Sequence, residues 1–239
     1  MPLVLTSHKI CPFGQRLWLA LESSGLPYTF SEVEIAPGKK SATFTSLYKS
    51  ALGADASSDG KVPILEHPEA AGGPLTLTES LHCADYVCAL APAARLLPEL
   101  PHERARTGLF LEGVGKYTGP FYALLMKQTA EEQEAARKAL IDACAALSAH
   151  LAHLGGPFLL GPRATFGDLM LWPFVERLCI LHHYRGFDLD AVAAAAPALA
   201  PLVAWRTAML ALPAVKATTM PPEFFIEGYA AYARGGPGK

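Results

Sequence analysis

The chain has 239 residues, of which 51% are hydrophobic and 18% charged, with 20 basic and 22 acidic side chains. The high apolar fraction and the formal net charge of −2 exclude a disordered chain, and the lack of a basic excess argues against a nucleic-acid binder. The most apolar tract, residues 189–205, is rich in alanine and is interrupted by Pro197 and Pro201. It is therefore a poor candidate for a membrane-spanning helix, and we expect no membrane partner.

Cysteine usage and the N-terminal sequence favour a reducing compartment. The five cysteines are odd in number and scattered, unlike the disulfide framework of a small secreted protein. The N-terminus enters an apolar run at residues 3–5 without the basic region or cleavage site of an export signal. We expect a cytoplasmic protein, or an organellar one if a transit peptide has been removed.

The first ninety or so residues alternate between strand-like and helix-like patterns. Short β-compatible runs occur at residues 3–6, 28–35, 62–65 and 75–77. Helical patterns occur at residues 12–24, weakly within 39–61, and from 78 to about 91. Gly25 follows the first of these helices, as expected of a glycine that ends a helix. The order β-α-β-α-β-β-α predicts a thioredoxin-like α/β domain.

The rest of the chain is predicted to be helical. Residues 92–100 contain two prolines, are followed by Pro101, and have no periodic pattern, which is typical of a linker. The clearest helix covers residues 131–154, where apolar side chains recur every three or four positions. Further helical patterns lie at 102–127, from 165 onward, at 198–212 and at 222–234. We therefore predict an α/β domain at 1–91, a linker at 92–100 and an all-helical domain at 101–239.

The sharpest local feature is Cys11, within the sequence Ile-Cys-Pro-Phe-Gly-Gln-Arg between the first strand and the first helix. Free N–H groups and the positive end of the helix dipole favour an anion there, which lowers the pKa of a thiol. Pro12 suits the first helical turn, where its missing N–H is no loss. Because position 14 is glycine, no resolving cysteine is near, and a mixed disulfide with a small thiol is favoured over an intramolecular disulfide. The alternative is an inert, buried cysteine.

Two further motifs follow in the same domain. Pro63 cannot donate to a strand ladder, so it belongs at an edge or in a turn, and a cis bond is compatible with it. In a thioredoxin-like domain it would face Cys11 and leave the main chain of Val62 free to pair with an extended peptide. Glu79 and Ser80, after Thr78, begin a helix, where an amino-acid head group fits: the hydroxyl and helix N-terminus suit a carboxylate, and Glu79 suits an ammonium. The alternatives are an ordinary edge strand and a simple helix cap.

These three motifs, in this order, resemble the glutathione-binding domain of the cytosolic glutathione transferases. Cysteine in Cys-Pro-Phe makes the chain most similar to the omega, lambda and dehydroascorbate reductase classes. Residues 156–161, followed by Thr165 and Asp168, resemble the buried capping element of the family's helical domain, and residues 172–177 resemble the omega and lambda pattern. The resemblance covers nearly the whole chain. It implies a thioredoxin-like N-terminal domain and an all-α C-terminal domain.

The resemblance implies a glutathione site made from residues of the first domain. It assigns these positions to the site: Cys11, Phe13, Lys39, Val62, Pro63, Glu79 and Ser80. Cys11 would be the nucleophile, beside Phe13, while the Val62 main chain would pair with the cysteinyl residue of glutathione. The γ-glutamyl head would lie on Glu79 and Ser80. A lysine would lie near the glycyl carboxylate; the loose alignment leaves both Lys39 and Lys40 open.

The acceptor substrate is expected between the two domains. Five aromatic residues of the helical domain are candidates to line its site: Phe110, Tyr117, Phe121, Trp172 and Trp205. Aromatics at helical spacing also commonly form a core, which is the alternative. His8 precedes Cys11 and is either an assistant to the thiolate or an exposed loop residue. No cluster has metal-ligand spacing, so we expect no metal.

The sequence thus predicts a glutathione-dependent thiol transferase that removes glutathione from substrates, a dehydroascorbate reductase, or both, acting through a Cys11–glutathione mixed disulfide. Glutathione would be the co-substrate. One alternative is a conjugating glutathione transferase that uses a hydroxyl, for which only Thr6 and Ser7 are near. The other is a non-enzymatic, redox-responsive protein that binds glutathione adducts. The family includes dimers and monomers, so a homodimer is one of two open states.

Overall fold

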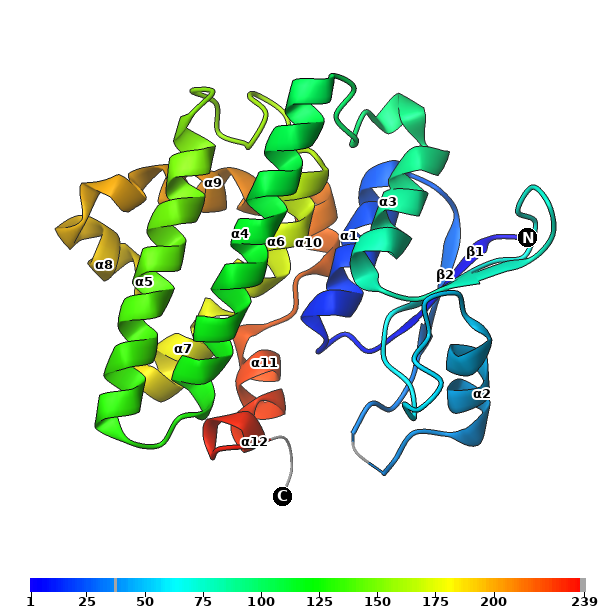
Figure 1. Ribbon diagram of the computed structural model, residues 1–239, viewed down its shortest axis with the longest axis horizontal. Helices are drawn as coiled ribbons and strands as arrows, with labels where there is room; N and C mark the ends of the chain where they lie inside the picture. The colour runs from blue at the N-terminus through cyan, green and yellow to red at the C-terminus, as the bar shows by residue number, and fades with distance from the viewer. Residues whose placement is uncertain (37, 237–239) are drawn as a thin grey trace. The chain divides into compact units, whose positions relative to one another are not determined.

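The structure, a computed structural model, describes residues 1–36 and 38–236. The chain divides into two compact units, Met1–Leu97 and Pro98–Lys239, which are considered separately below (Figure 1). The division falls inside the predicted linker at residues 92–100. A short 3-10 helix, Pro92–Ala94, belongs to the first unit.

A four-stranded sheet forms the centre of the first unit. Its strands are β1 (Leu3–Ser7), β2 (Tyr28–Glu32), β3 (Ile64–His67) and β4 (Leu75–Leu77), in the order β2-β1-β3-β4. β1 is parallel to β2 and antiparallel to β3, and β4 is antiparallel to β3. Leu5 is fully buried in the central strand, opposite Phe30 on one side and Leu65 on the other. The predicted order of strands and helices is confirmed.

Three helices pack on this sheet. α1 (Pro12–Ser24) and α3 (Ser80–Leu90) pack against each other on one face, and α2 (Ala42–Ser50) lies on the other face (Figure 1). α1 begins with Pro12 at its first position and ends at Gly25, whose φ of 69° is the left-handed conformation that glycine adopts without strain. Beneath α2, a small core cluster joins Phe44 and Tyr48 to Ile64 of β3.

The strand bounds differ from the prediction around Pro63. β3 begins at Ile64 rather than at residue 62, because Pro63 has no N–H to donate to the ladder. β3 is also an internal strand rather than an edge, since it pairs with both β1 and β4. The Val62–Pro63 peptide bond is cis. The proline therefore lies in the connection just before the strand, where a missing donor disrupts no pairing.

The second unit is helical. Its helices are α4 (Pro101–Met126), α5 (Ala130–Ala152), α6 (Phe166–Glu176), α7 (Leu178–Arg185), α8 (Leu189–Ala195), α9 (Ala200–Leu210), α10 (Pro213–Thr218), α11 (Pro222–Gly228) and α12 (Ala230–Ala233), with a 3-10 turn at Pro197–Leu199. α5 packs along α4 and α9, and α6 packs against α4. The helix predicted at 198–212 corresponds to the 3-10 turn followed by α9, whereas the one predicted at 222–234 is divided into α11 and α12. The helix predicted at 131–154 ends at Ala152, and Leu154 lies beyond that end and is exposed.

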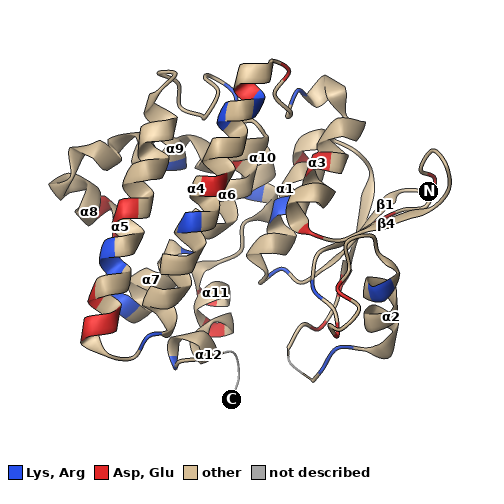
Figure 2. Cartoon of the chain, viewed as in Figure 1, with Lys and Arg blue, Asp and Glu red and all other residues tan. Residues whose placement is uncertain are grey.

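Charged side chains of both signs are interspersed along α4 and α5 (Figure 2). On α5, Glu134 pairs with Arg137 at 3.7 Å and Lys138 pairs with Asp142 at 3.4 Å. Such pairs three or four residues apart are typical of a solvated helix face. Over residues 1–36 and 38–236, every helix is too short or too polar to cross a bilayer.

Asp168, near the start of α6, is a fully buried carboxylate in the core of the helical unit. Oδ1 accepts hydrogen bonds from the Leu159 N–H at 2.9 Å and the Trp205 Nε1–H at 2.9 Å. Oδ2 accepts from the N–H of Thr165 at 2.8 Å and from its hydroxyl at 3.0 Å. Burial raises the pKa of this carboxyl, and the four hydrogen bonds oppose the rise. Asp168 is therefore a helix cap, as predicted, that also ties α9 to α6.

Candidate active site

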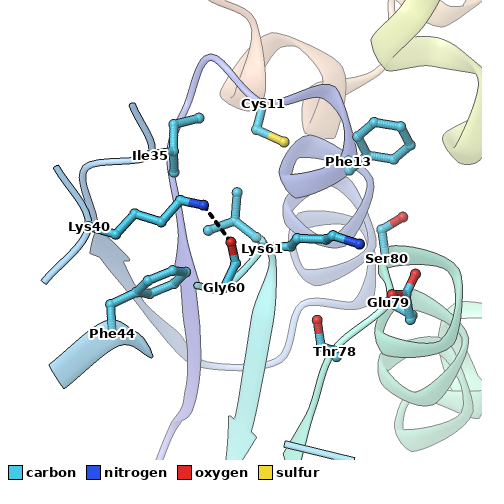
Figure 3. Close-up of a pocket in the computed structure, with 11 residues that line it drawn as sticks. Cys11, Phe13, Ile35, Lys40, Phe44, Gly60, Lys61, Thr78, Glu79 and Ser80 are labelled. Atoms are coloured by element: carbon cyan, nitrogen blue, oxygen red, sulfur yellow. Dashed lines mark hydrogen bonds between the residues drawn. The ribbon is translucent and has the colours of Figure 1, made fainter. Parts of the chain in front are cut away.

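Cys11 occupies the turn between β1 and α1. It is the N-cap residue of α1, with an extended backbone (φ −80°, ψ 119°), and its carbonyl accepts the Gln15 N–H at 3.0 Å. The side chain is half-buried, and its sulfur lies at the N-terminus of α1 on the same side as Phe13 (Figure 3). The first N–H groups of a helix and its dipole favour an anion at this end. The position is therefore suited to a thiolate.

His8 organises the turn that leads to Cys11. The N–H of Ile10 donates to His8 Nδ1 at 3.1 Å, and the N–H of Cys11 donates to the His8 carbonyl at 3.0 Å. His8 is not among the residues that line the adjacent pocket. It therefore acts on the backbone of the turn.

A pocket of about 370 Å³ opens beside Cys11 (Figure 3). Its wall is built entirely from the first unit, and it contains a thiol, two lysines and a carboxylate. The lining residues are Cys11, Phe13, Ile35, Lys40, Phe44, Gly60, Lys61, Val62, Thr78, Glu79 and Ser80. Among the residues assigned to a site from the sequence, Cys11, Phe13, Val62, Glu79 and Ser80 come together here. Pro63, the next residue in the chain, is buried and does not line the pocket.

One wall of the pocket offers an unused backbone edge. In the part of the chain that the structure describes, neither the N–H nor the carbonyl of Val62 makes a hydrogen bond. The next carbonyl, of Pro63, accepts from the Thr78 hydroxyl at 3.1 Å, so the connection is held from behind. A free donor and acceptor on an extended residue can pair with another extended backbone.

The start of α3 forms the far end of the pocket. Ser80 is the first residue of the helix and is buried, and its hydroxyl accepts from Arg16 Nη1 at 3.4 Å. Glu79, the N-cap, is exposed and has φ 69° and ψ 105°, which is unusual for a residue other than glycine. Such a backbone costs about 1–3 kcal/mol and tends to occur at ligand-binding positions. The strain presents Glu79 and the free N–H groups of α3 to the same space.

The structure resolves the choice between the two lysines in favour of Lys40. Lys39 is exposed and does not line the pocket. Lys40 is only 16% exposed, and its Nζ donates to Asp59 Oδ1 at 2.8 Å and to the Gly60 carbonyl at 2.7 Å. Ser41 caps α2 by accepting the Phe44 N–H at 3.1 Å, and Lys40 is the residue directly before this cap. Of the two lysines that the sequence left open, Lys40 is therefore the one that lines the pocket.

Several pocket residues were not predicted to contribute. Ile35 follows β2, Phe44 lies on the weakly patterned α2, and Gly60 lies in the loop between α2 and β3. Gly60 has φ 114°, and a Cβ on it would lie 2.6 Å from the Phe44 ring. Lys61 directly precedes Val62 and was assigned no role from the sequence. The only sequence signal for these residues was proximity to a recognised motif.

The five aromatic candidates for an acceptor site are core residues. Phe110, Tyr117, Phe121 and Trp205 are fully buried, and Trp172 is 1% exposed. The rings of Tyr117 and Phe121 stack at 6.3 Å between centroids, and those of Trp172 and Trp205 lie 6.1 Å apart. An open substrate site needs accessible side chains, so the structure contradicts this expectation. Their helical spacing reflects packing inside the second unit.

No other thiol resembles Cys11. Burial raises the pKa of Cys83, Cys88 and Cys144 to about 12 in each case, and it also raises the pKa of Cys179. The hydroxyls of Thr6 and Ser7 are buried and do not line the pocket. The described residues contain no group of three or more His, Cys, Asp or Glu that could hold a metal ion. Cys11 is thus the one thiol among the pocket-lining residues identified.

Comparisons with known proteins agree with this geometry. Residues 10–90 match the family model for the glutathione S-transferase N-terminal domain, and residues 130–208 match that for the C-terminal domain. Probable glutathione transferase omega-2 of Caenorhabditis elegans is 25% identical over 232 residues, covering 96% of this chain and 85% of that protein. Glutathione S-transferase DHAR2 of Arabidopsis thaliana is 29% identical over 182 residues, covering 75% and 72%.

The fold comparison leads to the same family. The crystal structure of glutathione transferase Omega 3C from Trametes versicolor matches with a TM-score of 0.80 and 27% identity, covering 98% of this chain and 91% of that one. The predicted fold class, a thioredoxin-like domain followed by an all-helical domain, is confirmed. The chain belongs to the glutathione transferase family, and its relatives include members of the omega class and a DHAR protein, as its cysteine-type motifs predicted.

Proposed function

We propose that this protein is a glutathione-dependent thiol transferase that works through a mixed disulfide between Cys11 and glutathione, and that dehydroascorbate is a second class of substrate. The observation that carries the proposal is the half-buried Cys11 at the N-terminus of α1, opening on a pocket built for a small peptide. The volume of about 370 Å³ lies within the range of small-ligand sites.

Each part of glutathione has a chemically matched partner in this pocket. The free N–H and carbonyl of Val62 suit the main chain of the cysteinyl residue. The N-terminus of α3 with the Ser80 hydroxyl suits the γ-glutamyl carboxylate, and the exposed Glu79 suits its ammonium. Lys40 suits the glycyl carboxylate at the other end. Docked in this way, the tripeptide brings its sulfur to Cys11.

The reaction consists of two thiol–disulfide exchanges. The Cys11 thiolate attacks the glutathione sulfur of a glutathionylated substrate; the substrate's S–S bond breaks and its thiolate leaves and takes up a proton. The thiolate of a second glutathione then attacks the glutathione sulfur bound to Cys11, releasing oxidised glutathione and the Cys11 thiolate. With dehydroascorbate, two glutathione molecules supply the two electrons and two protons that give ascorbate and oxidised glutathione. A stable Cys11 thiolate serves first as nucleophile and then as leaving group.

Replacement of Cys11 by serine tests this proposal. Cys11→Ser should abolish turnover of a glutathionylated peptide and of dehydroascorbate, and Cys179→Ser, at another half-buried cysteine, should leave both rates unchanged. After incubation with oxidised glutathione, the mass of the unmodified protein should increase by one glutathionyl group, and peptide mapping should locate it on Cys11. Full activity in Cys11→Ser would contradict the proposal.

The conjugating transferase is less well supported. That reaction needs a hydroxyl that stabilises a glutathione thiolate, and Thr6 and Ser7 are buried away from the pocket lining. We expect a chloronitrobenzene substrate to be conjugated slowly or not at all. A non-enzymatic glutathione-binding protein would form the Cys11 adduct without turnover. Rates with the three substrates, measured side by side, separate these alternatives.

A further inference from the structure

We propose that Asp59 is a positioning residue for the glutathione site, and that its carboxylate holds the Lys40 ammonium ready for the glycyl carboxylate. This inference rests on the proposed function. Asp59 is not a lining residue of the pocket, and it is too exposed, at 61%, to be recognised as part of a site by burial. Its contact with Lys40 is what connects it to the pocket.

Lys40 is held at two points. Its Nζ lies 2.8 Å from Asp59 Oδ1 and 2.7 Å from the Gly60 carbonyl, and Figure 3 shows the second of these bonds. An ammonium has three N–H donors. Two are used here, and among the described residues Lys40 has no other partner, so one donor is left for a ligand.

The loop that presents Asp59 is itself fastened to α2 and to its own turn. The Asp59 carbonyl accepts from the Thr45 hydroxyl at 2.8 Å, and the Ser58 hydroxyl accepts from the Gly60 N–H at 3.1 Å. Gly60 lies so close to Phe44 that a Cβ would come within 2.6 Å of the ring. The Asp59 backbone is therefore held by contacts to Thr45 and within its own turn, in addition to the bond between Lys40 and the Gly60 carbonyl. In this pair the loop is the fixed partner, and the long lysine side chain is the one that is ordered.

Ordering Lys40 in advance favours binding. A lysine side chain loses much rotamer entropy when it is fixed. If Lys40 is already fixed before the ligand arrives, this entropy cost does not reduce the free energy of ligand binding. Asp59 also attracts the ammonium, and the Lys40 hydrogen bond lowers the pKa of Asp59, so the carboxylate is charged at neutral pH. Because Asp59 is mostly in water, its repulsion of an incoming carboxylate is strongly screened. The net effect expected is tighter glutathione binding without a change at the sulfur.

Steady-state kinetics test this inference in the full-length protein. With a glutathionylated peptide at saturation, Asp59→Ala should raise the KM for glutathione by about two- to fivefold, the range of an exposed ion pair, while kcat stays unchanged. Asp59→Asn keeps an oxygen acceptor for Lys40 and should restore part of the loss. Asp55→Ala is the matched control, because Asp55 lies on the same loop but, among the described residues, its side chain hydrogen-bonds to Ser57 and not to Lys40.

A double-mutant cycle separates positioning from a structural effect of the loop. Lys40→Met alone should raise the KM more than Asp59→Ala, and Asp59→Ala should have no further effect in the Lys40→Met background. An Asp59→Ala effect that persists without Lys40, or an unchanged KM in Asp59→Ala when Lys40→Met raises it, would overturn the inference. An unchanged KM in Lys40→Met would instead contradict the assignment of Lys40 to the glycyl carboxylate. Failure of the proposed chemistry would show separately, as activity retained in Cys11→Ser.

Discussion

Asp168 should be the most sensitive polar residue for folding of the helical unit. It is fully buried and accepts four hydrogen bonds, from the Leu159 N–H, the Thr165 N–H and hydroxyl, and the Trp205 indole. Asp168→Ala removes both carboxylate oxygens and therefore the acceptor of each of these four bonds. The Thr165 hydroxyl can rotate to another partner, but the two backbone N–H groups and the indole N–H are left unsatisfied in the core.

The size of the effect follows from these three donors. A buried donor without a partner costs about 1–3 kcal/mol, so the substitution should destabilise the protein by roughly 3–9 kcal/mol. A domain has a total stability of about 5–15 kcal/mol, which makes the loss comparable with the whole. Asp188→Ala is the control, because Asp188 also caps a helix, α8, but lies less buried and accepts from two backbone N–H groups. A cap of that kind is worth about 0.5–2 kcal/mol.

Urea unfolding followed by far-ultraviolet circular dichroism gives the measurement. Asp188→Ala should shift the midpoint slightly, and Asp168→Ala should shift it several times further or prevent folding. If Asp168→Ala does not fold, Trp205→Phe provides a milder test, since it removes one donor and leaves Oδ1 bonded to Leu159. Equal midpoints for Asp168→Ala and Asp188→Ala would refute the reasoning.

Three further outcomes are expected. Ser80→Ala should raise the KM for glutathione about fivefold by removing one hydrogen-bonding hydroxyl at the start of α3, and a KM equal to that of the unmodified protein would count against the γ-glutamyl assignment. Gly60→Ala should lower the free energy of unfolding by roughly 2–4 kcal/mol, because φ is 114° and the added Cβ meets the Phe44 ring. Gly72→Ala, with φ 97° and open space around the added Cβ, should lower it less. Iodoacetamide at pH 8 should label Cys11 before the three cysteines with a pKa of about 12, of which about one in 10⁴ is ionised. Peptide mapping measures this order, and equally fast labelling of a buried cysteine would contradict it.

The features of the fold and of the site that the sequence predicted are those governed by local geometry. Pro12 indicates the start of a helix, because proline is accommodated in the first turn of a helix and disrupts its interior. Cys11, the residue before it, is then the N-cap. Thr165 and Asp168 have the spacing at which a side chain reaches back to the first N–H groups of a helix. In each case the pattern involves fewer than five residues. Tertiary structure changes such relations little.

The parts that were missed depend on contacts between distant segments. Phe44 and Gly60 reach the pocket because a loop returns to α2, and no short pattern records the length and course of that loop. The choice between Lys39 and Lys40 depended on where α2 begins. Ser41 as the N-cap would have indicated Lys40, since it is the residue directly before the cap.

The aromatic residues of the helical unit show a different limit. A spacing of three or four residues indicates which face of a helix is apolar, but it does not say what covers that face. Tyr117 on α4 and Trp172 on α6 satisfy the pattern equally well as core or as pocket residues. The structure assigns both to the core, because α4 and α6 pack against each other within the second unit.

The distribution of thiols determines how the proposed cycle must close. Position 14, where a resolving cysteine would have to lie on the first turn of α1, is glycine. Of the other four cysteines, three are buried with a pKa of about 12, and burial also raises the pKa of Cys179. None of these four cysteines lines the Cys11 pocket, so we expect a second glutathione to resolve the mixed disulfide on Cys11. The rate of resetting should then increase in proportion to glutathione concentration, so that stopped-flow release from the isolated Cys11 adduct becomes faster without an intercept at zero glutathione.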